Sequence, residues 1–152
     1  MNDELNDTGS RLLSAVARLN RWATRHAELR IPHAQARLLA LIDQVGPARI
    51  GELAVADHCS QPTMTTQVQR IEAAGWAFRT SDSKDARVAM IDLTPAGRAE
   101  LQELRIARAR TLAPQLDKLT DDERHALESA TEIILRLVSD SYEPTAGKTS
   151  VQ

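Results

Sequence analysis

Residues 60–75 read Ser-Gln-Pro-Thr-Met-Thr-Thr-Gln-Val-Gln-Arg-Ile-Glu-Ala-Ala-Gly, and this stretch decides the fold. Ser60 is a suitable N-cap, because its hydroxyl can accept a hydrogen bond from a free backbone N–H of the first turn. Pro62 fits the first turn, where its missing N–H costs nothing, and Gly75 is a suitable end. The pattern predicts a helix that starts and stops within this stretch.

The two faces of this helix differ in chemistry. At about 100° per residue, Met64, Val68 and Ile71 fall on one side, which is expected to pack on a core. The other side and its flanks carry hydroxyl, amide and guanidinium groups, which can bond DNA bases or phosphates. The candidates for DNA contact are Ser60, Gln61, Pro62, Thr63, Thr65, Thr66, Gln69 and Arg70. A solvated amphipathic helix is the alternative interpretation of the same pattern.

A charged β-hairpin is predicted directly after this helix. Residues 78–80 and 88–93 alternate and are rich in β-branched side chains, with the polar loop 81–86 between them. An arginine at such a tip can enter a narrow A·T minor groove. The DNA-contact candidates here are Arg79, Lys84 and Arg87, with Asp82 and Asp85 expected to support them by accepting their hydrogen bonds. Taken alone, a mixed-charge hairpin also fits a soluble turn.

Apolar periodicity predicts further helices before and after this helix and hairpin. The first begins at Ser10 and ends before Pro32, a nearly all-apolar one follows until Gly46, and a short one covers residues 51–57. A long helix starts at Thr94-Pro95, and Pro114 is expected to bend or interrupt it. Thr120 and Glu123 have capping-box spacing and open a last helix.

The order short helix, capped helix, charged hairpin predicts a mostly α fold with a small β-hairpin wing, that is, a winged helix-turn-helix with N- and C-terminal dimerisation helices. We expect one unit over residues 8–142, with flexible ends at 1–7 and 143–152. Within it, the winged helix-turn-helix covers about 36–94 and the dimerisation helices about 10–30 and 95–142. The outer helices would leave a wide apolar stripe, which predicts a homodimer.

Composition excludes several classes of protein. The chain has 152 residues and one cysteine, so an internally disulfide-stapled secreted scaffold is excluded. The N-terminus is acidic and no apolar run approaches a membrane span, so we expect a cytoplasmic protein without a membrane partner. No enzyme motif, cofactor motif or metal-ligand spacing is present, so we expect neither catalysis nor a cofactor or metal.

The net charge of −2 conceals an uneven distribution. Residues 8–119 hold 16 basic and 11 acidic side chains, whereas residues 120–143 hold seven acidic and two basic ones. A moderately basic body with acidic ends is compatible with a DNA partner that approaches the body.

From about Leu12 to Val138 the chain resembles the MarR family of dimeric winged helix-turn-helix transcription factors. The resemblance rests on Arg49-Ile-Gly-Glu-Leu-Ala54, Ser60-Gln-Pro-Thr-Met-Thr65 with Val68, Ile71, Glu72 and Gly75, Asp82-x-x-Asp85-x-Arg87, and Leu93-Thr-Pro-x-Gly97. It implies that residues 60–70 form the recognition helix, that Asp85 supports the wing arginine Arg87, and that the terminal helices dimerise. Thr66 and Ala86 stand where many relatives carry basic residues.

The resemblance implies a sequence-specific regulator of double-stranded DNA, a homodimeric repressor on a pseudo-palindromic operator. A small aromatic or carboxylate effector is expected to release it, and the candidate effector residues are Trp22, His26 and His33. A packed tryptophan with two exposed histidines is the alternative. Two other functions stay open: a winged-helix dimer that binds another protein, and a redox-responsive regulator acting through Cys59.

Overall fold

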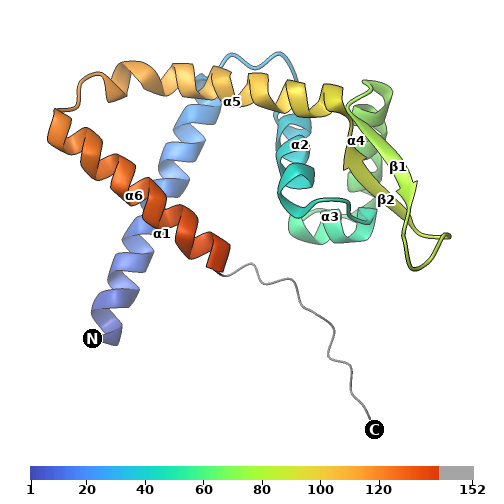
Figure 1. The fold of residues 1–152 in the computed structure, drawn as a ribbon, viewed down its shortest axis with the longest axis horizontal. Helices are drawn as coiled ribbons and strands as arrows, with labels where there is room; N and C mark the ends of the chain where they lie inside the picture. Colours follow the sequence, from blue (N-terminus) through green and yellow to red (C-terminus); the bar gives the residue numbers. More distant parts are fainter. Residues whose placement is uncertain (141–152) are drawn as a thin grey trace, which may run out of the picture. The chain divides into compact units, whose positions relative to one another are not determined.

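The computed structural model describes residues 1–140, which form six α-helices and one two-stranded sheet (Figure 1). In chain order the elements are α1 (Asn2–His26), α2 (His33–Val45), α3 (Ile50–Ala56), α4 (Gln61–Ala73), β1 (Ala77–Ser81), β2 (Ala89–Leu93), α5 (Pro95–Leu116) and α6 (Asp121–Asp140). The described residues divide into two compact units, one over residues 1–112 and one that begins at residue 113. The mostly α fold with a hairpin is therefore confirmed, whereas the flexible end expected at 143–152 lies outside the described residues.

One hydrophobic core organises the first unit. It forms where α2, α3 and α4 meet the hairpin and the N-terminal half of α5 (Figure 1). Its fully buried side chains are Leu39, Ile42, Leu53, Val68, Ile71 and Ile91. No polar or charged side chain among the described residues is buried with them. The hydrophobic effect thus holds the winged domain together without a buried polar network.

The hairpin is joined to the helices by backbone hydrogen bonds. β1 and β2 pair antiparallel, with Ala77 opposite Leu93. Ala48, between α2 and α3, forms a bridge with Ile91, in which each N–H donates to the other residue's carbonyl oxygen at 3.1 and 2.8 Å. Ala48 therefore adds a short extended segment between α2 and α3. It attaches the start of α3 to the centre of β2.

A close approach joins the turn after α4 to the start of α5. Gly75 has a φ of +77°, a left-handed conformation that suits glycine. The Thr94 hydroxyl donates to the Gly75 carbonyl oxygen at 2.6 Å and accepts the Gly97 N–H at 3.0 Å. A Cβ atom on Gly97 would lie 2.0 Å from the carbonyl oxygen of Trp76. Only glycine fits at that position without a shift of the backbone.

The limits of α1 differ from the prediction. The helix begins at Asn2 rather than Ser10, so the expectation of a flexible segment at residues 1–7 is corrected. Asp3 and Glu4 lie in the first turn, where negative charge interacts favourably with the helix dipole. The helix ends at His26 because Ala27 is extended, and residues 29 and 31 then pack against the core.

The C-terminal helices largely follow the prediction. Pro114 lies inside α5 without interrupting it, and the helix ends two residues later. A proline there removes one hydrogen bond from the last turn only. In the second unit, the Thr120 N–H donates to Glu123 Oε2 at 2.8 Å and the Glu123 N–H donates to the Thr120 hydroxyl at 3.2 Å. This confirms the capping box that opens α6.

We predict that Gly97→Ala destabilises the winged domain. The added methyl group would overlap the Trp76 carbonyl oxygen, and overpacking of this kind costs about 1–3 kcal/mol. The expected result is a lower midpoint in thermal or urea unfolding followed by circular dichroism. Gly9→Ala is the matched control, because nothing lies within 4 Å of a Cβ at Gly9. Equal unfolding midpoints for the two variants would contradict the argument.

Candidate nucleic-acid interface

The rotation of α4 about its axis is set by three buried side chains. Met64 is 1% exposed, and Val68 and Ile71 are 0% exposed. The residues opposite them are exposed, as the helical wheel predicts: Ser60, Gln61, Pro62, Thr63, Thr66, Gln69 and Arg70. Thr65 is half-buried at the edge. Gly75 is exposed directly beyond the helix end, where the sequence predicts the helix to stop.

The start of α4 is capped as predicted. The Ser60 hydroxyl accepts the Thr63 N–H at 3.3 Å and lies 2.7 Å from the Thr63 hydroxyl. Pro62 lies in the first turn. The Thr65 and Thr66 hydroxyls donate to the carbonyl oxygens of Gln61 and Pro62, at 2.9 and 3.1 Å. Each of these hydroxyls retains acceptor lone pairs for a partner outside the helix.

The wing loop presents two exposed cations, Lys84 and Arg87. The predicted hydrogen bonds from the side chains of these two cations to Asp82 and Asp85 are not formed. Asp85 Oδ1 accepts the backbone N–H of Arg87 at 3.0 Å, and Asp82 Oδ1 accepts the backbone N–H of Lys84 at 2.9 Å. Aspartates often bond the backbone two residues ahead in turns. Both acids therefore shape the loop backbone, and within residues 1–140 neither cationic side chain forms a hydrogen bond or salt bridge.

Arg79 differs from these two cations because an acidic side chain holds it. Its Nε and Nη2 donate to the two carboxylate oxygens of Glu72, on α4, at 2.8 and 3.0 Å. The hydrogen bond to Glu72 raises the pKa of Arg79 above its usual value. The structure therefore assigns Arg79 to a bidentate link between β1 and α4. The predicted pairing of Asp82 and Asp85 with Arg79 is corrected accordingly.

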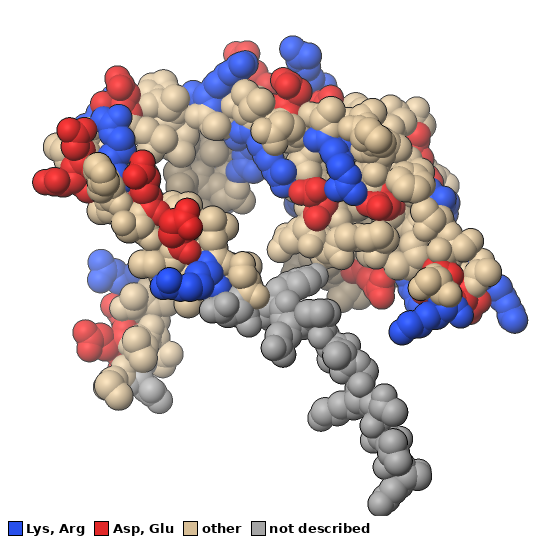
Figure 2. All heavy atoms as spheres, in the orientation of Figure 1, with Lys and Arg blue, Asp and Glu red and all other residues tan. Residues whose placement is uncertain are grey.

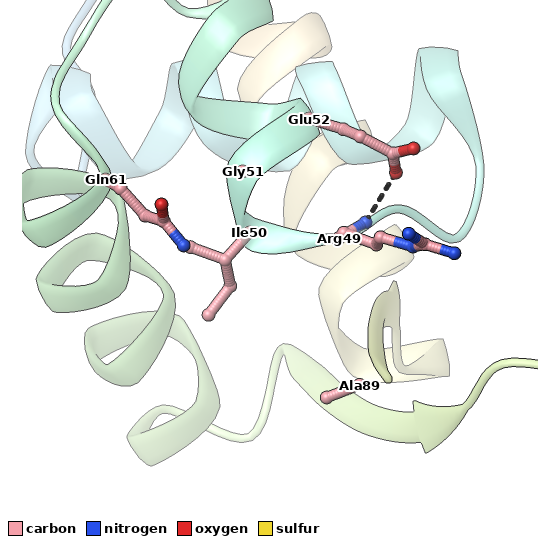
Figure 3. A pocket seen from close by; sticks show the side chains of 6 residues that line it. All are labelled: Arg49, Ile50, Gly51, Glu52, Gln61 and Ala89. Atoms are coloured by element: carbon pink, nitrogen blue, oxygen red, sulfur yellow. Dashed lines mark hydrogen bonds between the residues drawn. The ribbon is translucent and has the colours of Figure 1, made fainter. Parts of the chain in front are cut away.

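Sequence reasoning missed Arg49, the residue before α3. Its Nη2 donates to Asp82 Oδ2 at 2.9 Å, and its backbone N–H donates to Glu52 Oε2 at 2.8 Å. In Figure 3, Arg49 lies between Glu52 and the strand that carries Ala89, at the edge of a pocket of about 480 Å³. No spacing rule could find a pair separated by 33 residues.

The charge state of Asp82 follows from these contacts. The Lys84 N–H and then the Arg49 guanidinium lower the pKa of Asp82 below its usual value, and the hydrogen bond to Asp82 raises the pKa of Arg49. Because the folded-state pKa of Asp82 is depressed, its stabilising contribution is complete above the ordinary carboxylate pKa. It is lost as the pH falls through the folded value. The pair is therefore fully formed at neutral pH.

Surface charge around the wing is mixed rather than uniformly positive. Figure 2 shows Lys and Arg side chains projecting at the end of the wing with acidic side chains beside them. Glu72 and Asp82 partly neutralise Arg79 and Arg49. Among the described residues, the cations of the candidate interface that form no salt bridge are Arg70, Lys84 and Arg87.

The candidate effector residues are only partly brought together. Trp22 and His26 stack with ring centroids 4.8 Å apart, and His26 Nδ1 donates to the Trp22 carbonyl oxygen at 2.8 Å. They line a hollow of about 270 Å³ on α1 together with Arg18, Arg21 and Arg25. His33 does not line it and stands exposed at the start of α2.

Cys59 lies half-buried beside the core, directly before α4. This placement fits its structural interpretation as a small packed residue. Within residues 1–140, no three His, Cys, Asp or Glu side chains gather as a metal site. No helix in that range is long and apolar enough to cross a membrane.

Comparison with known proteins agrees with this geometry. The family model described as "MarR family" matches residues 31–89, which include the whole α2–α3–α4 arrangement. An HTH-type transcriptional regulator of Mycobacterium tuberculosis, MT0903.1, is 29% identical over 140 residues, which cover 89% of this chain and 98% of that protein. The chain is therefore similar to MarR-family proteins over its helix-turn-helix region, and to an HTH-type transcriptional regulator over most of its length.

Solved structures show the same MarR fold over most of the chain. A putative transcriptional regulator from Pseudomonas aeruginosa is 26% identical with a TM-score of 0.67, covering 91% of this chain and 97% of that one. A MarR family protein from Bacillus stearothermophilus is 24% identical with a TM-score of 0.65, covering 91% and 99%. A mutant of MepR from S. aureus, solved with an oligodeoxyribonucleotide, has a TM-score of 0.59 at 18% identity, covering 85% and 96%.

Proposed function

We propose that this protein is a transcriptional regulator of the MarR family, a homodimeric repressor that binds a pseudo-palindromic operator in double-stranded DNA. Its α4 enters the major groove and its wing contacts the adjacent backbone or minor groove. The observation that carries the proposal is the fixed rotation of α4, which buries Met64, Val68 and Ile71 and leaves the opposite face exposed. The oligonucleotide-bound MepR mutant has a similar fold, which supports DNA as the partner.

The exposed groups divide into two roles by chemistry. Gln69 and the Thr66 methyl group are suited to base edges, since an amide can bond adenine and a methyl group can contact thymine. Arg70, Lys84 and Arg87 are suited to phosphates, whose contacts position a protein without reading sequence. The Arg87 N–H donates to Asp85, so the backbone from which the Arg87 side chain extends is held in place. Base readout is therefore assigned to Thr66 and Gln69 of α4, and backbone contact to Arg70 and the wing.

We predict opposite signatures for two substitutions, measured by fluorescence anisotropy on DNA from the protein's own promoter region. Arg87→Ala should weaken binding to all sequences and reduce the slope of log K against log salt by about one per protomer. Gln69→Ala should change the preference between operator variants while leaving the salt slope unchanged. Lys118→Ala, between α5 and α6, is the charge-matched control. Feeble binding to any DNA, unaffected by Arg87→Ala, would favour a protein partner instead.

The dimer is proposed from a groove between α1 and α5 within the first unit. It measures about 590 Å³ and is mostly apolar, with the guanidinium-bearing residues Arg105 and Arg108 at one side. Leu13 is 71% exposed and Leu19 is 47% exposed. Burying such a side chain stabilises by about 1.5–3 kcal/mol relative to leaving it in water. A second copy is the occupant that we propose for this groove.

The last helix supplies the complementary surface. On α6, Leu127, Ile133, Leu135 and Val138 are between 43% and 57% exposed. The helix also carries exposed acids, whereas α1 carries the exposed arginines 11, 18, 21 and 25. Opposite charge on the two helices favours α6 of one copy beside α1 of the other. A two-fold dimer would set the recognition helices about 34 Å apart, one turn of DNA.

We predict that Leu13→Glu produces a folded monomer, because a charge placed in the groove opposes burial by the second copy. Size-exclusion chromatography with light scattering should show half the mass of the parent protein, with a helical circular dichroism spectrum retained. Val55→Glu is the control, since Val55 is 77% exposed on α3, outside the groove. A Leu13→Glu variant with the parent mass would contradict the proposed interface.

Effector release is proposed at the hollow on α1. A planar carboxylate could stack on Trp22 and His26 while Arg18 and Arg25 bind its charge. A ligand shifts the dimer only if it binds its two conformations with different affinity. We predict that an aromatic carboxylate such as benzoate raises the melting temperature and weakens DNA binding. Trp22→Ala should abolish both effects. An unchanged melting temperature across a panel of such acids would remove this part of the proposal.

A further inference from the structure

The wing is braced against the helices by two ion pairs. The base of the hairpin is fixed by the buried residues Ala77, Ile91 and Leu93. Beyond this base, Arg79 binds Glu72 of α4, and Asp82 binds Arg49 at the start of α3. The first pair belongs to a strand, whereas the second joins the loop of residues 82–88. The Arg49–Asp82 pair is therefore the side-chain link between the wing loop and the helix-turn-helix.

The backbone of Arg49 is held in place by hydrogen bonds on both sides. The preceding residue, Ala48, forms the two-bond bridge with Ile91. The Arg49 N–H donates to Glu52, and the Arg49 carbonyl oxygen accepts the Leu53 N–H at 3.0 Å. Both backbone polar groups of Arg49 are thus hydrogen-bonded within the first turn of α3. Its guanidinium extends from a fixed point, as Figure 3 shows beside Glu52.

Asp82 is likewise held in place by hydrogen bonds, in its case within the wing loop and to Arg49. One carboxylate oxygen accepts the Lys84 N–H, and the other accepts the Arg49 guanidinium. Its backbone N–H donates to the Val88 carbonyl oxygen at 2.9 Å, which closes the loop. The Asp82 side chain is 14% exposed, against 50% for Arg49. A shift of this carboxylate would therefore move the backbone that carries Lys84.

We infer that Arg49 is a positioning residue, which holds the wing loop where Lys84 and Arg87 can reach the DNA while α4 lies in the major groove. The inference rests on the proposed function, because it concerns the same DNA complex. An exposed ion pair contributes little to global stability. The effect of Arg49 is therefore on the place and order of the loop rather than on the folding of the domain.

Two neutral variants distinguish positioning from direct contact with DNA. Asp82→Asn keeps an oxygen for the Lys84 N–H but removes the charge that binds Arg49, and Arg49→Gln removes the other partner. Positioning requires both variants to weaken operator binding, by roughly three- to tenfold, and the double variant to be no weaker than either single one. If Arg49 instead bound a phosphate, loss of the competing Asp82 charge would strengthen binding.

A second measurement needs no DNA. Hydrogen exchange of the free protein should be faster at residues 82–88 in both variants and unchanged in α4, with the parent melting temperature retained. The control is Arg37→Gln with Asp57→Asn, which breaks an ion pair of similar exposure between α2 and the residue after α3, with two hydrogen bonds of 2.6 and 3.0 Å. This control should leave the exchange of the wing unchanged.

The possible outcomes test the positioning role of Arg49 and the proposed DNA-binding function separately. Unchanged wing exchange, tighter binding by Asp82→Asn, or additive losses in the double variant would each overturn the positioning role. Faster exchange without any loss of operator affinity would overturn it as well. A parent protein that binds no DNA at all would instead contradict the proposed function, and the exchange data would still test the link between Arg49 and the loop.

Discussion

The burial of one face of α4 is the constraint on which the rest of the structure depends. Met64, Val68 and Ile71 contact the core with almost no exposed surface, so the helix cannot rotate without exposing apolar groups to water. The exposed side chains on the opposite face of α4 therefore all point away from the core in one fixed direction. A helix held by a dry, tightly packed face is a rigid platform, and rigidity of this kind is what recognition of base edges requires.

The long helix α5 extends that rigidity toward the first helix. Arg98 donates to Asp43 of α2 at 3.1 Å and to Asp92 of β2 at 3.2 Å, and Arg105 donates to Asp43 at 2.8 Å. Gly97 packs its backbone against Trp76 at the same end. A displacement of the N-terminal half of α5 would therefore move α2 and the hairpin together, which is the type of link that a regulator of DNA affinity needs.

The sequence predicts the parts of this structure that depend on local chemistry. The cap at Ser60, the polar face of α4, both strands and the Thr120 capping box follow from residues within one or two turns of each other. The sequence predicts the start of α1 at Ser10, eight residues too late, because Ser10 resembles an N-cap although the helix continues through it. The wing contacts could not be predicted, because Arg49 and Asp82 meet only once the hairpin has folded back on α3.

The pairing of Arg79 and Arg49 with acids has a consequence for how the protein would search a genome. Nonspecific affinity for DNA grows with the number of cations that are free to displace counterions, and here two of the arginines near the wing are already neutralised within the fold. Weak sequence-independent binding shortens the time spent on irrelevant DNA, although it also shortens sliding. Internal ion pairs would in this way raise the ratio of specific to nonspecific occupancy without any additional base contact.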